Sequence, residues 1–362
     1  GIPSPAMDTR QAALVAVLAT ATAVVWWRVR RRQHRIVRRA ALDIGSGQHK
    51  MLIADVDVTP RGTKIVKILH SVQRQVLLSH DLVGRGEDTL SEEILRQSRD
   101  VIGAFCAMAR EWGAVEVAGV GTAVFRKARN GRAYLRSLRE ALGVRVEVVP
   151  QDEEGELGFL TALSSGYVDR RDLVAWDSGS GSFQITGVAA DALGCYEGPL
   201  GDSRVTQMLL DLAGVISPRA STGLSASPNP VKLEHARALV IALRDSIPPP
   251  PDWLLRKVAR PETTVVAIGE RTSIFYVAAS ILGTNFLHRT DVWSAVERVA
   301  NRDDADLAAA LPLFGEEAMA VPKLCLLYSV MEVAGMESVT FVQTMGSCEG
   351  ILLAGDVLWS QQ

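Results

Sequence analysis

One short pattern occurs twice in this 362-residue chain and constrains its fold more than any other feature. Each copy is an apolar run that ends in an aspartate, followed by a glycine-rich turn and a second apolar run. The first copy is RAALDIGSG (39–47) with MLIADVDV (51–58), and the second is LVAWDSGSGSFQI (173–185). The two aspartates, Asp43 and Asp177, lie 134 residues apart, which is the length of a typical domain. We therefore expect a duplicated α/β architecture.

Both turns have the composition of a phosphate-binding loop. Glycine lets the main chain approach an anion closely, and consecutive N–H groups in such a turn form a concave anion site. One such turn is equally typical of a plain hairpin, but two turns a domain's length apart favour a two-sided phosphate clamp. The expected phosphate-binding residues are Gly45, Ser46, Gly47, Ser178, Gly179, Ser180, Gly181 and Ser182. A carboxylate at the end of each strand can hold a divalent metal beside the phosphate.

The rest of the chain alternates between helix-like and strand-like segments. Apolar periodicity predicts helices at 91–112, 131–142, 152–163, 231–244, 274–286, 291–310 and 322–333, and further strands at 64–76, 115–124, 144–150, 263–269 and 339–347. The segments 215–230 and 247–252 have the composition of loops. The expected division is a first segment at 1–37, a first domain at 38–165, a second domain at 166–345 and a C-terminal helix at 346–362 that returns to the first domain.

The N-terminal segment differs in charge from everything that follows. Residues 12–27 are uncharged and mostly apolar, and an arginine block follows directly, so residues 1–42 carry +7 and the remainder −9. Sixteen residues fall just short of a spanning helix, which snorkelling arginine and interfacial tryptophan could complete. We expect a membrane anchor that holds the body on the cytosolic side. The alternative is an organelle-targeting segment, since transit peptides are also rich in arginine and poor in acidic residues.

Other sites are disfavoured by the residues that would have to build them. The four cysteines are widely spaced and never form C-x-x-C, which excludes a disulfide scaffold or a zinc ribbon. The six histidines show no metal-pair spacing. No nucleic-acid-binding motif is present, and a membrane surface explains the arginine block better than DNA does.

Four segments together resemble the Ppx/GppA phosphatases, the exopolyphosphatases and guanosine pentaphosphate phosphohydrolases of the actin-like ATPase superfamily. The segment 120–163 resembles the family's G-T-x-x-x-R-x-A-x-N motif, its helix and strand, and the Glu-Glu pair before the next helix. Residues 173–185 resemble its D-I-G-G-G-S-T-E strand and turn, and 345–353 resemble its terminal S-x-G-L-R-E-G. GPLGDSRVT (198–206) lies where a glycine-containing strand and turn are expected. The resemblance covers about residues 38–355 and implies two actin-like (ribonuclease H-like) domains with an interdomain cleft, preceded by an apolar helix, in the short two-domain form.

The resemblance also assigns roles to individual residues. Glu154 matches the family's water-activating glutamate, and Arg126 matches the arginine that contacts the phosphate chain. Asp177 and Asp43 would hold Mg²⁺ (or Mn²⁺), and Glu153 and Glu349 would line the cleft. These roles suit the chemistry, because hydrolysis of a phosphoanhydride needs charge neutralisation on the transferred phosphoryl group and a positioned water.

Several positions depart from the family pattern. Gln48 and Gln184 replace residues that would offer a hydroxyl and a carboxylate, Glu156 stands where an arginine is usual, and Cys348 replaces an arginine. The turn at 268–273 carries Glu270 and Arg271 in place of small residues, which argues against an adenosine pocket and hence against a kinase. Each loss of a cation or donor should weaken the binding of polyanions.

The leading functional prediction is an exopolyphosphatase-like hydrolase that releases terminal phosphate, with inorganic polyphosphate as the first-ranked substrate. The alternative is a catalytically impaired protein that binds polyphosphate or guanosine penta- or tetraphosphate. The expected partners are that phosphate ligand and a membrane, with no nucleic acid, and a homodimer is one expected assembly.

Overall fold

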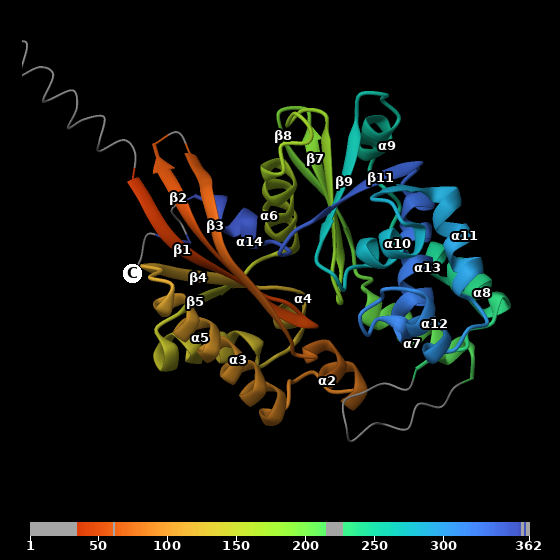
Figure 1. Ribbon diagram of the computed structural model, residues 1–362, viewed down its shortest axis with the longest axis horizontal. Helices are drawn as coiled ribbons and strands as arrows, with labels where there is room; N and C mark the ends of the chain where they lie inside the picture. Colours follow the sequence, from red (N-terminus) through yellow and green to blue (C-terminus); the bar gives the residue numbers. More distant parts are fainter. Residues whose placement is uncertain (1–34, 61, 215–226, 356–357, 360–362) are drawn as a thin grey trace, which may run out of the picture.

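The computed structural model describes residues 35–60, 62–214, 227–355 and 358–359 of the chain. These residues form two β-sheets that stand side by side, with helices packed on their faces (Figure 1). The two copies of the repeated pattern lie in different sheets, because Asp43 ends a strand of the first and Asp177 a strand of the second. The mixed α/β class with two sheets is thereby confirmed.

The first sheet has five strands in the order β3-β2-β1-β4-β5. Their bounds are β1 Arg35–Ile44, β2 Gln48–Thr59, β3 Gly62–Gln75, β4 Glu116–Gly121 and β5 Arg145–Val148. Strands β1, β2 and β3 form an antiparallel meander, whereas β4 and β5 continue the sheet in parallel to β1. In the β1–β2 hairpin Asp43 lies opposite Lys50. Directly opposed residues share one face of a sheet, so this register brings an ammonium beside the first aspartate.

The second sheet repeats this plan with one more strand, in the order β10-β11-β9-β6-β7-β8. Its strands are β6 Leu173–Ser178, β7 Phe183–Ala189, β8 Ala192–Gly198, β9 Thr264–Gly269, β10 Phe286–His288 and β11 Ser338–Gln343. Again three antiparallel strands come first, and β9 and β11 follow in parallel to β6. Asp177 lies opposite Gln184, so the second hairpin has an amide where the first has Lys50.

The helices follow most of the expected positions. Those joined to the first sheet are α2 Leu78–Arg85, α3 Glu92–Glu111, α4 Ala123–Lys127, α5 Gly131–Leu142 and α6 Gln151–Ser164. Those joined to the second sheet are α7 Asp202–Leu212, α8 Leu233–Ser246, α9 Asp252–Val258, α10 Ile274–Leu282, α11 Arg289–Val299, α12 Asp304–Ala310, the 3₁₀ turn η1 Glu317–Met319 and α13 Ala320–Val333. The last helix, α14 Cys348–Leu353, follows β11 in the chain but packs against the first sheet.

One expected helix ends earlier than predicted, and another is divided in two. The helix expected at 274–286 stops at Leu282 because Gly283 takes a left-handed conformation, with φ of 72°, and caps it. The helix expected at 291–310 is two helices. Asn301 has a φ of 61° and breaks the first, and the Asp303 side chain accepts from the Asp306 amide to start the second.

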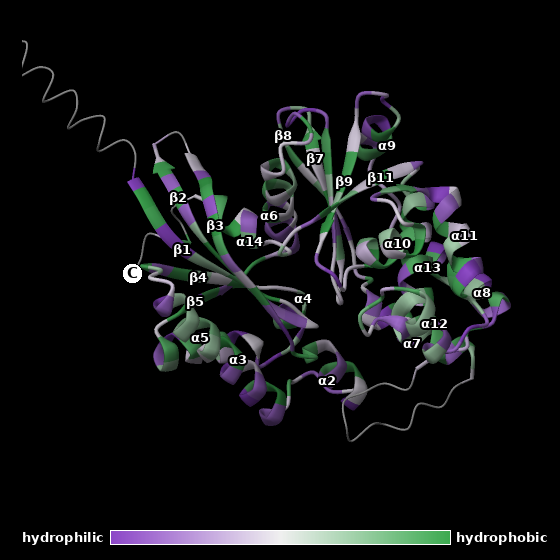
Figure 2. Ribbon diagram, in the orientation of Figure 1, coloured by the Kyte–Doolittle hydropathy of each residue, from purple (hydrophilic) through white to green (hydrophobic). Residues whose placement is uncertain are grey.

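Two helices, α6 and α14, lie between the sheets (Figure 1). Leu157 of α6 packs with Ile351 and Leu352 of α14 against the first sheet, whereas Phe159 of α6 packs against the second. Figure 2 shows the strands and the helix faces that pack on them as largely hydrophobic. Helix α6 is therefore fixed from both sides, which holds the carboxylates of its first turn in place. The predicted division at 38–165, 166–345 and 346–362 stays a prediction.

The expected membrane placement is corrected by the structure. Within residues 35–60, 62–214 and 227–355, no helix has both the length and the apolar character that crossing a membrane requires. This finding contradicts the membrane-anchored localisation, which we withdraw. The apolar run at 12–27, expected as a helix, and the targeting alternative both lie outside the described residues.

Candidate active site

The two glycine-rich turns face each other across a cavity of about 220 Å³ between the sheets. Their approach is close, since a Cβ on Gly47 would come within 2.6 Å of the Ser180 hydroxyl and one on Gly181 within 3.2 Å of the Ser46 hydroxyl. Side chains larger than hydrogen at these two positions would push the turns apart. The cavity thus lies where the sequence predicts a two-sided phosphate clamp, and its wall includes all eight predicted phosphate-binding residues.

Each turn is closed by its own backbone. The Gly45 amide donates to the Gln48 carbonyl at 2.9 Å, and the Gly179 amide donates to the Ser182 carbonyl at 3.0 Å. The Ser46 hydroxyl accepts from the Val124 amide, which ties the first turn to α4. These bonds fix the turns before any ligand enters.

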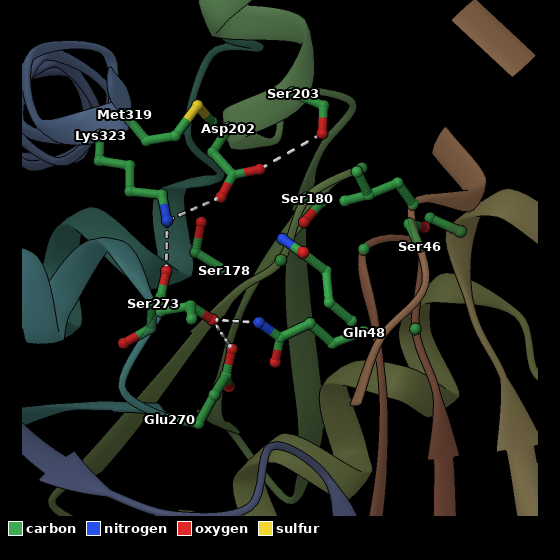
Figure 3. A pocket seen from close by; sticks show the side chains of 18 of the residues that line it. Ser46, Gln48, Ser178, Ser180, Asp202, Ser203, Glu270, Ser273, Met319 and Lys323 are labelled. Atoms are coloured by element: carbon green, nitrogen blue, oxygen red, sulfur yellow. Dashed lines mark hydrogen bonds and ion pairs between the residues drawn. The ribbon is translucent and has the colours of Figure 1, made fainter. Parts of the chain in front are cut away.

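Two buried polar atoms in the cavity wall have no hydrogen-bond partner among the described residues. They are the Ser178 hydroxyl oxygen and the Gln48 side-chain oxygen (both residues are labelled in Figure 3). An orphaned buried polar atom costs free energy of about 1–3 kcal/mol. A polar ligand or water in the cavity would satisfy both atoms.

Glu154 lies at the start of α6 and contributes to the cavity wall. The Arg126 guanidinium donates to Glu154 Oε2 at 2.6 Å and to the Val149 carbonyl at 2.9 Å. Burial raises the pKa of Glu154 to about 7, even though Arg126 acts in the opposite direction. A carboxylate with a pKa near neutrality exchanges protons readily at physiological pH, as a general base must.

Asp43 and Asp177 lie on either side of Ser347, whose amide donates to Asp43 at 3.2 Å and whose hydroxyl donates to Asp177 at 3.5 Å. Burial raises the pKa of both carboxyls, that of Asp177 to about 7, against the opposing charge of Lys50. The charges of Glu154 and Asp43 add to the shift at Asp177. A surplus of buried carboxylates of this kind attracts cations.

Asp43 and Asp177 are the carboxylates that would bind a divalent cation in this cavity. In the described part of the chain, no group of three or more His, Cys, Asp or Glu side chains is placed to hold a metal ion. Asp43 is already paired with Lys50, whereas Asp177 has no ion-pair partner within the described residues. Magnesium is commonly held by one or two carboxylates together with substrate phosphates. The donors therefore fit a cation that enters with the substrate.

Lys50 is a site residue that sequence reasoning missed. Its ammonium lies 3.7 Å from Asp43 and 3.1 Å from Glu270 of the β9–α10 turn. Burial would lower the pKa of Lys50, but Glu270, Asp43 and Asp177 together raise it, so the side chain carries its charge. The hairpin register, which sets Lys50 opposite Asp43, is the signal that could have found it.

A second cluster of charges lines the opposite part of the cavity and was also missed. Lys323 of α13 is buried, with a side chain only 2% exposed, and pairs with Asp202 at 3.3 Å (Figure 3). It also pairs with Glu316 at 2.5 Å. It also donates to the Thr272 carbonyl. Because these residues come from elements far apart in sequence, no local sequence pattern predicts the cluster.

Three predicted residues do not line the cavity. Arg126 reaches it only through its ion pair with Glu154. Glu153 is exposed on the outer side of α6. Glu349 is buried and accepts from the Met345 amide, so it stabilises the start of α14. The structure thus brings together Asp43, Asp177, Glu154 and both turns.

Comparison with known proteins agrees with this architecture. Residues 56–219 match the sequence profile of the Ppx/GppA phosphatase family. A guanosine-5'-triphosphate,3'-diphosphate pyrophosphatase of Photobacterium profundum is 31% identical over 155 residues, which cover 42% of this chain and 29% of that protein. An uncharacterised protein of Streptomyces coelicolor is 28% identical over 202 residues, 56% of this chain and 55% of that protein. The chain thus spans less than two thirds of the length of these curated relatives.

Solved structures share the fold. A Ppx/GppA family member of Aquifex aeolicus superposes with a TM-score of 0.64 at 17% identity, covering 88% of this chain and 97% of that one. An exopolyphosphatase of Cytophaga hutchinsonii gives a TM-score of 0.65 at 18% identity, covering 87% and 96%. The resemblance to this family drawn from the sequence motifs is confirmed.

Proposed function

We propose that this chain, which belongs to the Ppx/GppA phosphatase family by its match over residues 56–219, hydrolyses the terminal phosphoanhydride bond of a phosphate chain. The first-ranked substrate is inorganic polyphosphate. The observation that carries the proposal is the meeting of two phosphate-type turns and a carboxylate of raised pKa, Glu154, in the wall of one cavity. Together they supply what the reaction needs, an anion site and a base.

The proposed mechanism assigns one task to each part of the site. The amides and hydroxyls of the two turns hold the terminal phosphates between the sheets. Glu154 accepts a proton from a water molecule as the water oxygen bonds to the terminal phosphorus. The bond from that phosphorus to the bridging oxygen breaks, and the shortened phosphate chain leaves with the electron pair on that oxygen. Arg126 keeps the carboxylate oriented toward the cavity. Asp177, with Asp43 beside it, would hold Mg²⁺ (or Mn²⁺), and the ion supplies charge neutralisation on the phosphate oxygens.

A second function is favoured by one observation. Among the described residues, the cavity is lined by two lysines and by six carboxylates, those of Asp43, Glu154, Asp177, Asp202, Glu270 and Glu316. Such a surplus of negative charge opposes a long polyanion, which suits a protein that binds polyphosphate or guanosine penta- or tetraphosphate weakly and without turnover. No finding supports the expected homodimer or the expected membrane partner.

Phosphate release separates the two functions. Purified protein is incubated with polyphosphate, guanosine pentaphosphate or ATP in the presence of Mg²⁺ or Mn²⁺, and orthophosphate is measured over time. The hydrolase proposal expects release that is fastest from polyphosphate. Saturable binding of a ligand without any release would favour the binding protein instead.

The hydrolysis rate should depend on pH through Glu154. Because burial raises the pKa of this carboxyl to about 7, it is protonated and inactive as a base below that pH. We expect kcat/KM to rise about tenfold per pH unit below neutrality and to level off above it. Rates measured between about pH 5 and about pH 9 check this, and a flat profile would contradict the assignment of Glu154 as base.

A further inference from the structure

We infer that Glu270 is a specificity-determining residue that competes with the substrate's phosphate for Lys50, and so limits how tightly the cavity binds phosphate chains. The inference rests on the proposed function, because it concerns the same cavity. It is carried by the position of these two side chains and by the partners that each one has.

Lys50 is the cation placed to meet a phosphate held by the turns. The described residues that line the cavity include two lysines, and the other, Lys323, already contacts Asp202, Glu316 and the Thr272 carbonyl. Lys127 donates to the Gly181 carbonyl but lies outside the wall. Arg126 is committed to Glu154. Lys50 follows the first turn directly and lines the same cavity.

Glu270 has the contacts that a bound phosphate oxygen would make. Its Oε2 accepts from the Lys50 ammonium at 3.1 Å, and its Oε1 accepts from the Thr272 hydroxyl at 2.7 Å. An ammonium and a hydroxyl are donors that phosphate groups use in proteins. The carboxylate is also buried, with only 9% of the residue exposed, so solvent screens its charge poorly.

A further hydrogen bond keeps this arrangement in place across the cavity. The Gln48 side chain, from the first turn, donates to the Thr272 hydroxyl at 2.8 Å, and Gln48 and Glu270 point toward one another in Figure 3. Burial would raise the pKa of Glu270, but Lys50 and the Thr272 hydroxyl outweigh it and lower the pKa, so the carboxylate stays charged. A phosphate that approaches Lys50 therefore finds its ammonium already paired with the Glu270 carboxylate.

Two of the departures from the family pattern thus act together. Gln48 and Glu270 are 222 positions apart in sequence, yet they share the Thr272 hydroxyl. A phosphate chain can bind Lys50 only by displacing the Glu270 carboxylate or by bringing a cation to neutralise it. The residue would weaken binding most for highly charged chains that lack a bound metal.

Binding of inorganic tripolyphosphate, measured by isothermal titration calorimetry with EDTA present, tests the competition. Glu270→Gln keeps the size of the side chain and its acceptor for Thr272 but removes the charge. We expect it to bind tripolyphosphate about tenfold more tightly than the wild type, and Lys50→Met to bind about tenfold more weakly. Glu156→Gln, on the exposed side of α6, removes one charge outside the cavity and should leave binding unchanged.

The double variant decides between competition and a general charge effect. If Glu270 acts through Lys50, Glu270→Gln gains nothing in the Lys50→Met background. A gain that persists there, an unchanged or lower affinity of Glu270→Gln, or no tripolyphosphate binding by any correctly folded variant would each overturn the inference. Thermal unfolding of every variant checks the fold.

The outcome is distinguishable from that of the proposed function. Suppose that Glu270→Gln binds tripolyphosphate more tightly, that this gain depends on Lys50, and that the protein releases no phosphate. The hydrolase proposal would then be wrong and the competition would be supported. If the wild type hydrolyses polyphosphate but Glu270→Gln binds tripolyphosphate with unchanged affinity, the hydrolase proposal stands and the competition is wrong.

Discussion

Replacing Glu154 by glutamine is expected to lower kcat for phosphate release by about 10²–10⁴-fold with little change in KM. Glutamine keeps the size of the side chain and can still accept from Arg126, but it cannot take a proton from water at neutral pH. The Arg126 ion pair and the buried face of α6 hold the Glu154 side chain in place, so the substitution removes a positioned proton acceptor. Steady-state kinetics with polyphosphate and Mg²⁺ measure the effect.

The matched control lies one half-turn away on the same helix. Glu156 is exposed and does not line the cavity, so Glu156→Gln should keep the wild-type rate. Undiminished release by Glu154→Gln would remove this residue from the role of base. An equal loss in both variants would show that α6 responds to any charge change, and not to the loss of a proton acceptor.

Replacing Gly350 by alanine is expected to destabilise the protein by about 3 kcal/mol, although alanine favours helix over glycine by about 1 kcal/mol. Gly350 lies in α14 where this helix crosses α6, and its amide donates to the Thr161 hydroxyl at 2.9 Å. A Cβ there would lie 2.0 Å from the Leu157 carbonyl oxygen, which belongs to the backbone and cannot rotate away. Denaturant unfolding followed by circular dichroism measures the loss.

Gly103 provides the matched control for this substitution. It also lies within a helix, α3, but a Cβ there would meet the Leu142 side chain at 3.7 Å, an ordinary contact. Gly103→Ala should therefore be neutral or stabilising by up to about 1 kcal/mol. If Gly350→Ala proved as stable as Gly103→Ala, then α14 would not be held against α6 as described. Helix α6, which carries Glu154, would then be held by the second sheet but not by α14.

The parts of the fold that sequence could predict are those encoded locally. Asp43 and Asp177 each follow a buried strand and precede a glycine turn, and this pattern predicted both hairpins. The helices at 131–142 and 152–163 also lie close to their predicted bounds. The first has apolar residues at helical spacing, and the second begins directly after Pro150. Helix α7 was missed, since its start at Asp202 lies in a segment that resembled a strand and turn.

The parts of the site that could not be predicted depend on contacts between distant segments. Lys50 and Glu270 approach each other only after both sheets have formed, so no motif contains the pair. The metal site at Asp43 stays a prediction, and Lys50 beside it was overlooked for a different reason. This lysine belongs to the same hairpin as Asp43, and sequence spacing alone does not say which strand positions face the cavity.

The split in net charge also has a structural counterpart. The excess of acidic residues in 43–362 includes the six carboxylates described in the cavity wall. Two of them, Glu154 and Asp177, have pKa values raised to about 7. Raised pKa values reduce the charge that an incoming phosphate meets near neutral pH. A metal carried by the substrate would reduce it further.

Hydrolysis of polyphosphate in water enriched in ¹⁸O follows the attacking water, and so shows whether this cavity hydrolyses the terminal phosphoanhydride bond. We expect the wild-type protein with Mg²⁺ to release orthophosphate that carries one solvent oxygen atom, and Glu154→Gln to release it about 10²–10⁴-fold more slowly. If folded wild-type protein releases no orthophosphate from polyphosphate, guanosine pentaphosphate or ATP with either Mg²⁺ or Mn²⁺, the protein is not the hydrolase proposed above.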